Sequence, residues 1–142
     1  MASSSDFPAR GKVIAVLDNA VIFAPSNTNY ELKLLTTGKY TGPVGTPVDA
    51  IIKGQSRKLW TVASGGNFLT PIQGPPRIVQ GRIKYLDSQV VVIQAGCPVT
   101  IQLPAADNAL DLNNGELAVG TLVNSTVLPG ATFELATATA AV

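Results

Sequence analysis

Two similar stretches decide the fold, GKVIAVLDNAVIF at residues 11–23 and GRIKYLDSQVVV at residues 81–92. Each begins with a glycine, continues through apolar and polar residues, and carries an aspartate, Asp18 or Asp87, before a second apolar run. The aspartate follows its glycine one position sooner in the second stretch, which has therefore lost a residue between them. Such a repeat predicts that two copies of one unit make up the chain.

The similarity continues after these stretches. Tyr30–Leu34 alternates apolar and polar residues, and so does Val99–Leu103, at the same offset as the two aspartates. Farther along, residues 45–48 correspond loosely to residues 115–117, each group beginning with a glycine. We therefore expect internal duplication.

Both units are expected to be β-structure. The period-two alternation of Tyr30–Leu34 and Val99–Leu103 places one face on a core and the other in water. Val90–Ile93 is a continuous β-branched run, which indicates a strand buried on both faces. Short polar pairs, Asp18-Asn19 and Asp87-Ser88, fit tight hairpin turns. Only residues 105–112, which follow a proline, have a pattern that allows one or two helical turns.

We therefore predict an all-β protein, an internally duplicated small β-barrel or sandwich made of two OB-like or Greek-key units related by a pseudo-twofold axis. This likeness concerns strand number and spacing, and it implies no function. Whether the repeats form one barrel or two stays open. The expected organisation is an N-terminal arm (1–9), a first β-repeat (10–62), a Gly/Pro-rich connecting loop (63–77), a second β-repeat (78–136) and a C-terminal tail (137–142).

The connecting loop contains the most unusual stretch, GGNFLTPIQGPPR at residues 65–77. One interpretation is a linker that prolines stiffen and glycines bend. The other is a shaped surface loop, in which Phe68 and Ile72 are pinned to the body or offered to a partner. Neither of the usual glycine-rich phosphate-binding motifs occurs in it.

Composition excludes several classes of site. The 142 residues include no histidine and one cysteine, Cys97. Histidine-dependent catalysis, histidine-ligated metal sites, an internal disulfide and Cys-x-x-Cys motifs are therefore absent. We expect no metal and no cofactor. The first residues lack the basic flank and apolar stretch of a signal peptide, and no apolar run is long enough to cross a bilayer, so we expect no signal peptide and no membrane association. The location stays unknown, with the cytoplasm and an assembled particle as the two expectations.

Enzymatic activity is not expected. Asp18 and Asp87 at matching positions suggest an aspartic-protease-like pair, but their turns lack the Asp-Thr/Ser-Gly pattern of that family, and hairpin roles fit better. Cys97 has no histidine to activate it and is predicted to be a buried, inert thiol. Lys84 and Tyr85 have the chemistry for base catalysis, but nothing shows that they converge. We assign no catalytic residue.

Charge is distributed unevenly along the chain. Residues 1–52 sum to zero, residues 53–85 contain six cations and no acid, and residues 86–142 contain five acids and no base. The basic segment and two nearby aromatic rings form the candidate interaction surface: Lys53, Arg57, Lys58, Trp60, Phe68, Arg77, Arg82 and Lys84.

Two functions fit this layout. The favoured one is a non-enzymatic structural protein that self-associates or decorates a larger assembly, such as a shell, capsid or filament, through complementary basic and acidic patches and terminal arms. The alternative is a small β-barrel module that binds single-stranded nucleic acid or another polyanion, with Trp60 and Phe68 as stacking platforms. A Trp60 buried in the core would weigh against the second.

Overall fold

A computed structural model describes residues 4–104, 110–112 and 115–136. Its structure is all-β, with one mixed sheet and a single 3-10 turn, η1 (Ser4–Asp6). The strands are β1 (Ala9–Val16), β2 (Ala20–Pro25), β3 (Glu31–Leu35), β4 (Pro47–Thr61), β5 (Phe68–Thr70), β6 (Gln73–Gly74), β7 (Ile78–Leu86), β8 (Val90–Gln94), β9 (Pro98–Gln102), β10 (Leu110–Asp111), β11 (Leu122–Val127) and β12 (Thr132–Leu135).

Some of the expected features lie outside the described residues. Most of the possible helical turn, residues 105–109, is among them, and Leu110–Asp111 forms β10 instead. Residues 1–3 of the N-terminal arm and the C-terminal tail (137–142) are also outside. In the described part of the arm, η1 contacts β8, and the ring centroids of Phe7 and Tyr85 on β7 are 5.9 Å apart. No helix in the described ranges is long and apolar enough to span a membrane.

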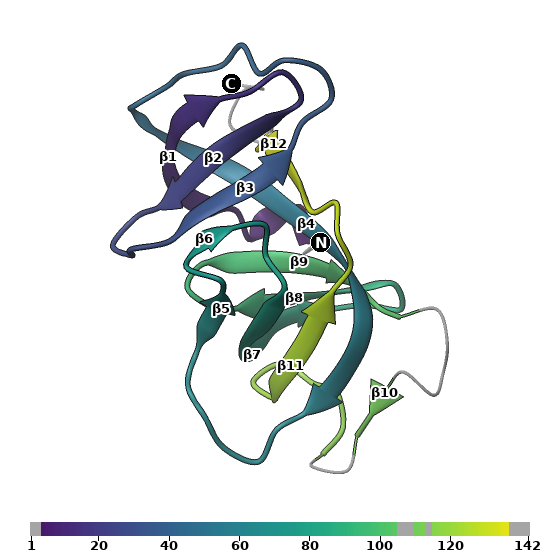
Figure 1. The fold of residues 1–142 in the computed structure, drawn as a ribbon. Coiled ribbons are helices and arrows are strands. Elements are labelled where there is room, and N and C mark those ends of the chain that lie inside the picture. The colour runs from purple at the N-terminus through teal and green to yellow at the C-terminus, as the bar shows by residue number, and fades with distance from the viewer. Residues whose placement is uncertain (1–3, 105–109, 113–114, 137–142) are drawn as a thin grey trace.

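The strand pairings form two closed circuits, which we call the first ring and the second ring. In the first ring, β1, β2, β3, β12 and residues 47–53 of β4 pair in that order, and β4 pairs back to β1. In the second ring, β7, β8, β9, residues 53–61 of β4 and β11 pair in that order, and β11 pairs back to β7. The rings lie one above the other, and β4 runs through both (Figure 1).

Each ring contains one strand, or part of one, from the other half of the chain. After its first half pairs with β1, β4 continues into the second ring and lies parallel to β9. After β11 completes the second ring, β12 returns to the first and pairs parallel to β3. Each ring therefore has four antiparallel pairings and one parallel pairing, and neither can form from one half of the chain alone.

Two glycines in the opening stretches occupy equivalent crowded positions. A Cβ atom on Gly11 would collide with the backbone oxygen of Ala24, and one on Gly81 would collide with that of Gln94. Both sites are where a strand crosses close to its hairpin partner, and only glycine allows this approach. This explains why both stretches begin with glycine.

The two hairpins also share their irregularities. Ile14 and Lys84 are the extra residues of β-bulges in the β1–β2 and β7–β8 pairs. In each turn a backbone N–H donates to the carbonyl three residues later, Leu17 to Ala20 in the first hairpin and Asp87 to Val90 in the second. Leu17, and not Asp18, is therefore the positional counterpart of Asp87, so the expected matching of the two aspartates is wrong by one residue.

The pairing of the fourth strands corrects a second alignment. Gly11 lies opposite Val48, and Gly81 lies opposite Val123. The counterpart of Val48 is thus Val123 rather than Leu117, because the second half has a longer excursion before its fourth strand. Sequence alignment could not find this, since the intervening residues share no pattern.

The interior is apolar and continuous through both rings. Val91, Val92 and Ile93 of β8 are all buried, which confirms the prediction for these three residues of the β-branched run, whereas Val90 is half-buried. Leu32 and Leu34 of β3 are buried while their neighbours are exposed or half-buried, which confirms the predicted alternation in this strand. In β9 the same prediction is wrong at Thr100, which is buried like Val99 and Ile101 on either side of it. Burial of apolar side chains supplies most of the free energy that favours folding.

The connecting segment is attached to both rings. β5 pairs with β7, and β6 pairs with β3. The hydroxyl of Tyr30 accepts a hydrogen bond from the backbone N–H of Leu69 at 3.0 Å, and Leu69 is buried. Phe68 is half-buried, whereas Ile72 remains 58% exposed. The segment is therefore a shaped part of the body.

Candidate functional site

A row of four side chains crosses the outer side of the second ring. Trp60 on β4 lies opposite Asn124 on β11, Asn124 lies opposite Gln80 on β7, and Gln80 lies opposite Phe68 on β5. Residues directly opposite each other in a sheet point to the same face. The row therefore has an aromatic ring at each end and two amides between them, and we call it the ring–amide row.

The two amides are hydrogen-bonded in one direction. Nδ2 of Asn124 donates to Oε1 of Gln80 at 2.8 Å, and Nε2 of Gln80 donates to the carbonyl of Gly66 at 3.0 Å. Both side chains are more than nine-tenths buried. Oδ1 of Asn124 is buried without a hydrogen-bond partner among the described residues. The amide chain therefore ends in an unused acceptor, which is costly in a protein interior.

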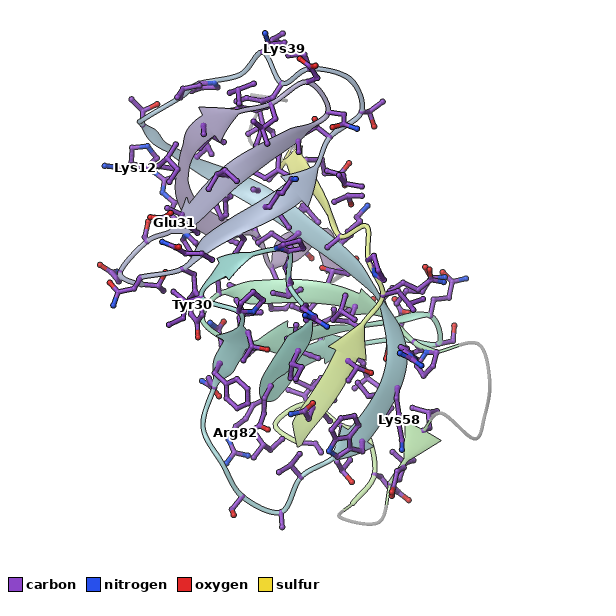
Figure 2. The ribbon with its side chains drawn as sticks, viewed as in Figure 1. Lys12, Tyr30, Glu31, Lys39, Lys58 and Arg82 are labelled. Atoms are coloured by element: carbon purple, nitrogen blue, oxygen red, sulfur yellow. The ribbon has the colours of Figure 1, made fainter. Side chains whose placement is uncertain are left out.

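Cations flank the ring–amide row on both sides. Lys58 follows the same face of β4, and its ammonium nitrogen lies 6.0 Å from the centroid of the Trp60 ring. This separation is at the outer limit of a useful cation–π contact. On the other side, Arg82 is exposed on β7, and its Nη1 donates to the carbonyl of Gly120 at 2.8 Å. Lys58 and Arg82 both lie on the second ring (Figure 2).

Two more arginines border hollows at the edge of this face. Arg57 and Arg77 line the same two adjoining hollows, of about 440 and 450 Å³. Of the predicted surface residues, the structure thus gathers six around β4, β11, β7 and β5: Arg57, Lys58, Trp60, Phe68, Arg77 and Arg82. We call this group, with the ring–amide row, the basic aromatic face.

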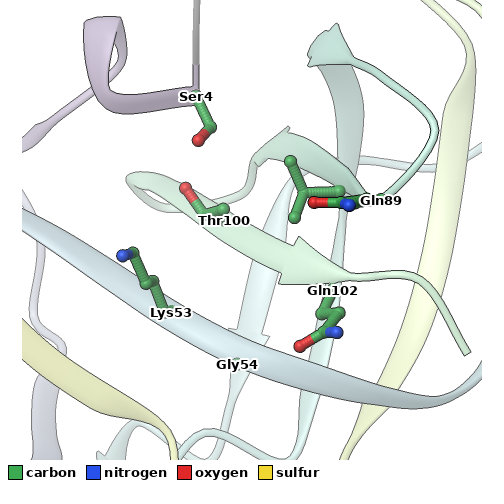
Figure 3. A pocket seen from close by; sticks show the side chains of 7 residues that line it. Ser4, Lys53, Gly54, Gln89, Thr100 and Gln102 are labelled. Atoms are coloured by element: carbon green, nitrogen blue, oxygen red, sulfur yellow. The ribbon is translucent and has the colours of Figure 1, made fainter.

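The other two predicted residues lie elsewhere. Lys84 is the bulge residue near the far end of β7. Lys53 lies where β4 passes between the rings, and its Nζ is 2.8 Å from Oε1 of Glu134. It borders a separate hollow of about 270 Å³ with Ser4, Thr100 and Gln102 (Figure 3). Lys53 is therefore not part of the surface that contains Arg57, although the two residues are close in sequence.

Sequence reasoning missed Gln80 and Asn124. Each is a polar residue inside a largely apolar strand, which is the available signal. Their meeting depends on the register between β7 and β11, which the sequence does not show.

Asp87, in the turn between β7 and β8 of the second ring, uses both of its carboxylate oxygens in hydrogen bonds. Oδ1 of Asp87 accepts hydrogen bonds from the backbone N–H groups of Gln89 and Val90, and Oδ2 accepts one from the Tyr85 hydroxyl at 2.9 Å. The backbone hydrogen bonds lower the pKa of Asp87, and the hydrogen bond to Asp87 raises the pKa of Tyr85. Asp111, which β10 places beside Trp60, is an acidic neighbour of the basic aromatic face.

Catalytic arrangements are not apparent in the described ranges. Asp18 and Asp87 belong to hairpins of different rings, and the Asp87 carboxylate is used within its own turn. Cys97 is buried, as predicted, and burial raises the pKa of its thiol to about 12. Among the described residues, no three His, Cys, Asp or Glu side chains are grouped closely enough to hold a metal ion.

Comparisons with known proteins find no relative. No protein-family model matches the chain, and neither a curated protein nor a solved structure resembles it significantly.

Proposed function

We propose that each ring is an OB-like five-stranded barrel and that the chain arose by duplication with exchange of the last strands. The closed circuits, the parallel pairing in each and the equivalent glycines Gly11 and Gly81 support this. A barrel of this kind hosts many functions. The function must therefore be argued from the side chains.

The protein acts in this proposal as a non-enzymatic module that binds single-stranded nucleic acid on its basic aromatic face. The observation that carries the proposal is the ring–amide row, with Trp60 and Phe68 at its ends and Lys58 and Arg82 beside it. Single-strand binders combine aromatic stacking platforms with cations that follow the phosphates. Trp60 is only half-buried, so its ring is not sealed in the core.

The geometry favours two separate bases, one stacked on the Trp60 side chain and one on the Phe68 side chain. Trp60 and Phe68 lie three strand spacings apart, which is roughly 14 Å. This distance is too great for one base to contact both rings. The two amides between them are buried and carry no charge, and the cations lie at the margins of the row, where a strand would carry its phosphates.

An unpaired strand fits this face better than a duplex. In a duplex the flat faces of the bases are stacked on one another and are not available to protein rings. Single-stranded bases can be splayed out and stacked on Trp or Phe. Few cations are involved, so we expect modest affinity that falls as salt rises.

Fluorescence anisotropy of a labelled oligothymidylate of about 12 nucleotides tests the proposal. Trp60→Leu and Lys58→Gln should each weaken binding, and loss of one stacked base costs about 1–3 kcal/mol. Lys12→Gln and Lys39→Gln are matched controls, because Lys12 lies on β1 of the first ring and Lys39 lies in the loop between β3 and β4, away from the second ring (Figure 2). The proposal fails if the oligonucleotide does not bind, or if both pairs of variants weaken binding equally.

Self-association or decoration of a larger assembly is the second candidate. Ile14 is 44% exposed and Val44 is 53% exposed, and the N–H of Gly45 donates to the carbonyl of Val13 at 2.9 Å, which holds these two segments together. Such a patch on the first ring fits a second copy of the chain. Electrostatic complementarity contributes less than the charge layout suggests, since Glu134 pairs with Lys53.

Light scattering after size-exclusion chromatography tests this second candidate. An assembling protein should show oligomers that Ile14→Asp dissociates, whereas Lys33→Asp, an exposed change on β3, should not. A strictly monomeric species at high concentration would remove self-association from consideration.

A further inference from the structure

Arg57 owes its direction to an irregularity in the sheet. In the β4–β11 pair, Lys58 lies opposite Thr126 and Ser56 lies opposite Val127, so Arg57 has no opposite residue. It is the extra residue of a β-bulge, a feature that re-aims side chains and often occurs beside binding sites. As a result Arg57 and Lys58 are both exposed in succession, although regular alternation would turn one of them inward.

Arg77 is fixed in position by its backbone. Its N–H donates to the carbonyl of Thr70 at 2.8 Å, and its carbonyl accepts the N–H of Val127 at 2.9 Å. The residue just before β7 is thus held between β5 and β11. Arg57 and Arg77, although distant in sequence, reach the same two hollows as a consequence.

The described residues that line these hollows include several prolines and no acid. The first hollow is also lined by Thr70, Pro71, Ile78, Thr126 and Val127, and the second by Pro75, Pro76, Val127, Leu128 and Pro129. Neither arginine belongs to the ion pairs found among the described residues, which are Arg10–Asp49 and Lys53–Glu134. Two like charges therefore border one space that no acidic side chain of the described residues lines.

We propose that Arg57 and Arg77 together bind one phosphate group. A guanidinium presents parallel N–H donors that match two oxygens of a phosphate, and two guanidiniums match its charge as well as its shape. Thr70 and Thr126 also line this hollow, but the Thr126 hydroxyl already donates a hydrogen bond to the carbonyl of Lys58 at 3.4 Å, so the two arginines carry the binding. Proline walls keep the hollow in shape, so little ordering is required on binding.

This inference deepens the proposed function and rests on it for the source of the phosphate, a nucleic acid strand. Lys58 is next to Arg57 in sequence and lies beside the Trp60 ring. A strand with a base on Trp60 would therefore bring a phosphate toward the two arginines. That phosphate is either an internal phosphodiester or a terminal phosphomonoester, which carries more charge.

The test titrates the full chain with inorganic phosphate at constant ionic strength and follows arginine side-chain NMR signals. Signals of Arg57 and Arg77 should shift together, and Arg57→Gln or Arg77→Gln should lower phosphate affinity by at least about fivefold. Arg57→Lys should recover only part of that loss, because it keeps charge without the paired donors. Arg10→Gln is the matched control, because Arg10 lies on β1 of the first ring, outside the proposed binding face, and it should change affinity less than about twofold.

A second arm compares oligothymidylates with and without a 5′-phosphate. A preference for the phosphorylated strand that Arg77→Gln abolishes assigns the site to a strand end, and equal, arginine-dependent binding assigns it to the backbone. The inference is overturned if phosphate shifts neither arginine signal, or if Arg57→Gln and Arg77→Gln bind the strand as the unmodified protein does. If the two variants bind the strand as the unmodified protein does, the proposed function is still supported and only the phosphate site is excluded. If phosphate binds the hollows and no oligonucleotide binds at all, the proposed function fails and the phosphate site remains.

Discussion

Trp60 and Asn124 lie directly opposite each other in the β4–β11 pair, and Oδ1 of Asn124 is buried there without a hydrogen-bond partner among the described residues. An aromatic ring thus borders a buried amide of which only the donor half is used. This pairing sets both the stability and the recognition properties expected of the basic aromatic face.

Asn124→Asp should be strongly destabilising. It replaces the Nδ2 donor with a carboxylate that faces Oε1 of Gln80, so a buried negative charge lies against an acceptor. We expect a loss of about 2 kcal/mol or more in the free energy of unfolding at neutral pH. Urea denaturation measures it, and Thr126→Asp, a less buried position on the same strand, is the control. A change in Asn124→Asp no larger than in the control would contradict this account.

Gly81→Ala tests the close approach of β7 to β8. The added Cβ would meet the backbone oxygen of Gln94, which cannot move without disturbing the pair. Overpacking of this kind costs about 1–3 kcal/mol of unfolding free energy. Gly66→Ala is the matched control, because a Cβ there meets no atom within 4 Å. Equal unfolding midpoints for the two variants would show that the strands are not so close.

Asp87 makes stability depend on acid pH. Its pKa in the folded protein is lower than its ordinary value of 3.8, chiefly because two backbone N–H groups donate to it. Its contribution is therefore present above that ordinary value and is lost as the pH falls through the folded pKa. Asp87→Asn should be less stable than the unmodified protein at neutral pH, and the difference should shrink below about pH 4.

Asp18→Asn is the control for that measurement, since Asp18 accepts no comparable side-chain hydrogen bonds within the described ranges. A gap between Asp87→Asn and the unmodified protein that is constant from neutral to acid pH would contradict the assigned role of Asp87.

Cys97 should be unreactive in the folded protein. Its side chain is 4% exposed, and burial raises its thiol pKa to about 12. At pH 8 only about one thiol in 10⁴ would be ionised. Ellman's reagent should therefore react fully in urea and negligibly without it, with free cysteine as the reference. Rapid reaction of the folded protein would show that the thiol is open to solvent.

The sequence predicted the composition of the sheets better than their connections. Alternation at Leu32 and Leu34, the buried run Val91–Ile93 and the opening glycines depend on local geometry, which a sequence pattern records. The passage of β4 into the second ring and the return of β12 to the first ring do not depend on local geometry, because an alternating strand fits either ring equally well. Pairings between distant segments decide that choice.

The same limit applied to the candidate site. Lys53 and Arg57 are close in sequence, yet Lys53 pairs with Glu134 and Arg57 is directed elsewhere by a bulge. Arg57 and Arg77 are distant in sequence and border one space. A bulge depends on the register of two strands, so no single segment could indicate it.

Trp60 fluorescence reports directly on a strand bound to the basic aromatic face, because Trp60 is the only tryptophan in the chain. The protein is titrated with an unlabelled oligothymidylate at several salt concentrations between about 50 and 200 mM. The account predicts saturable quenching of Trp60, with an affinity that falls with salt at a logarithmic slope of about −2, as expected for three phosphate contacts. Fluorescence that stays constant as the strand is added, at every salt concentration, would contradict the assignment of this face to single-stranded nucleic acid.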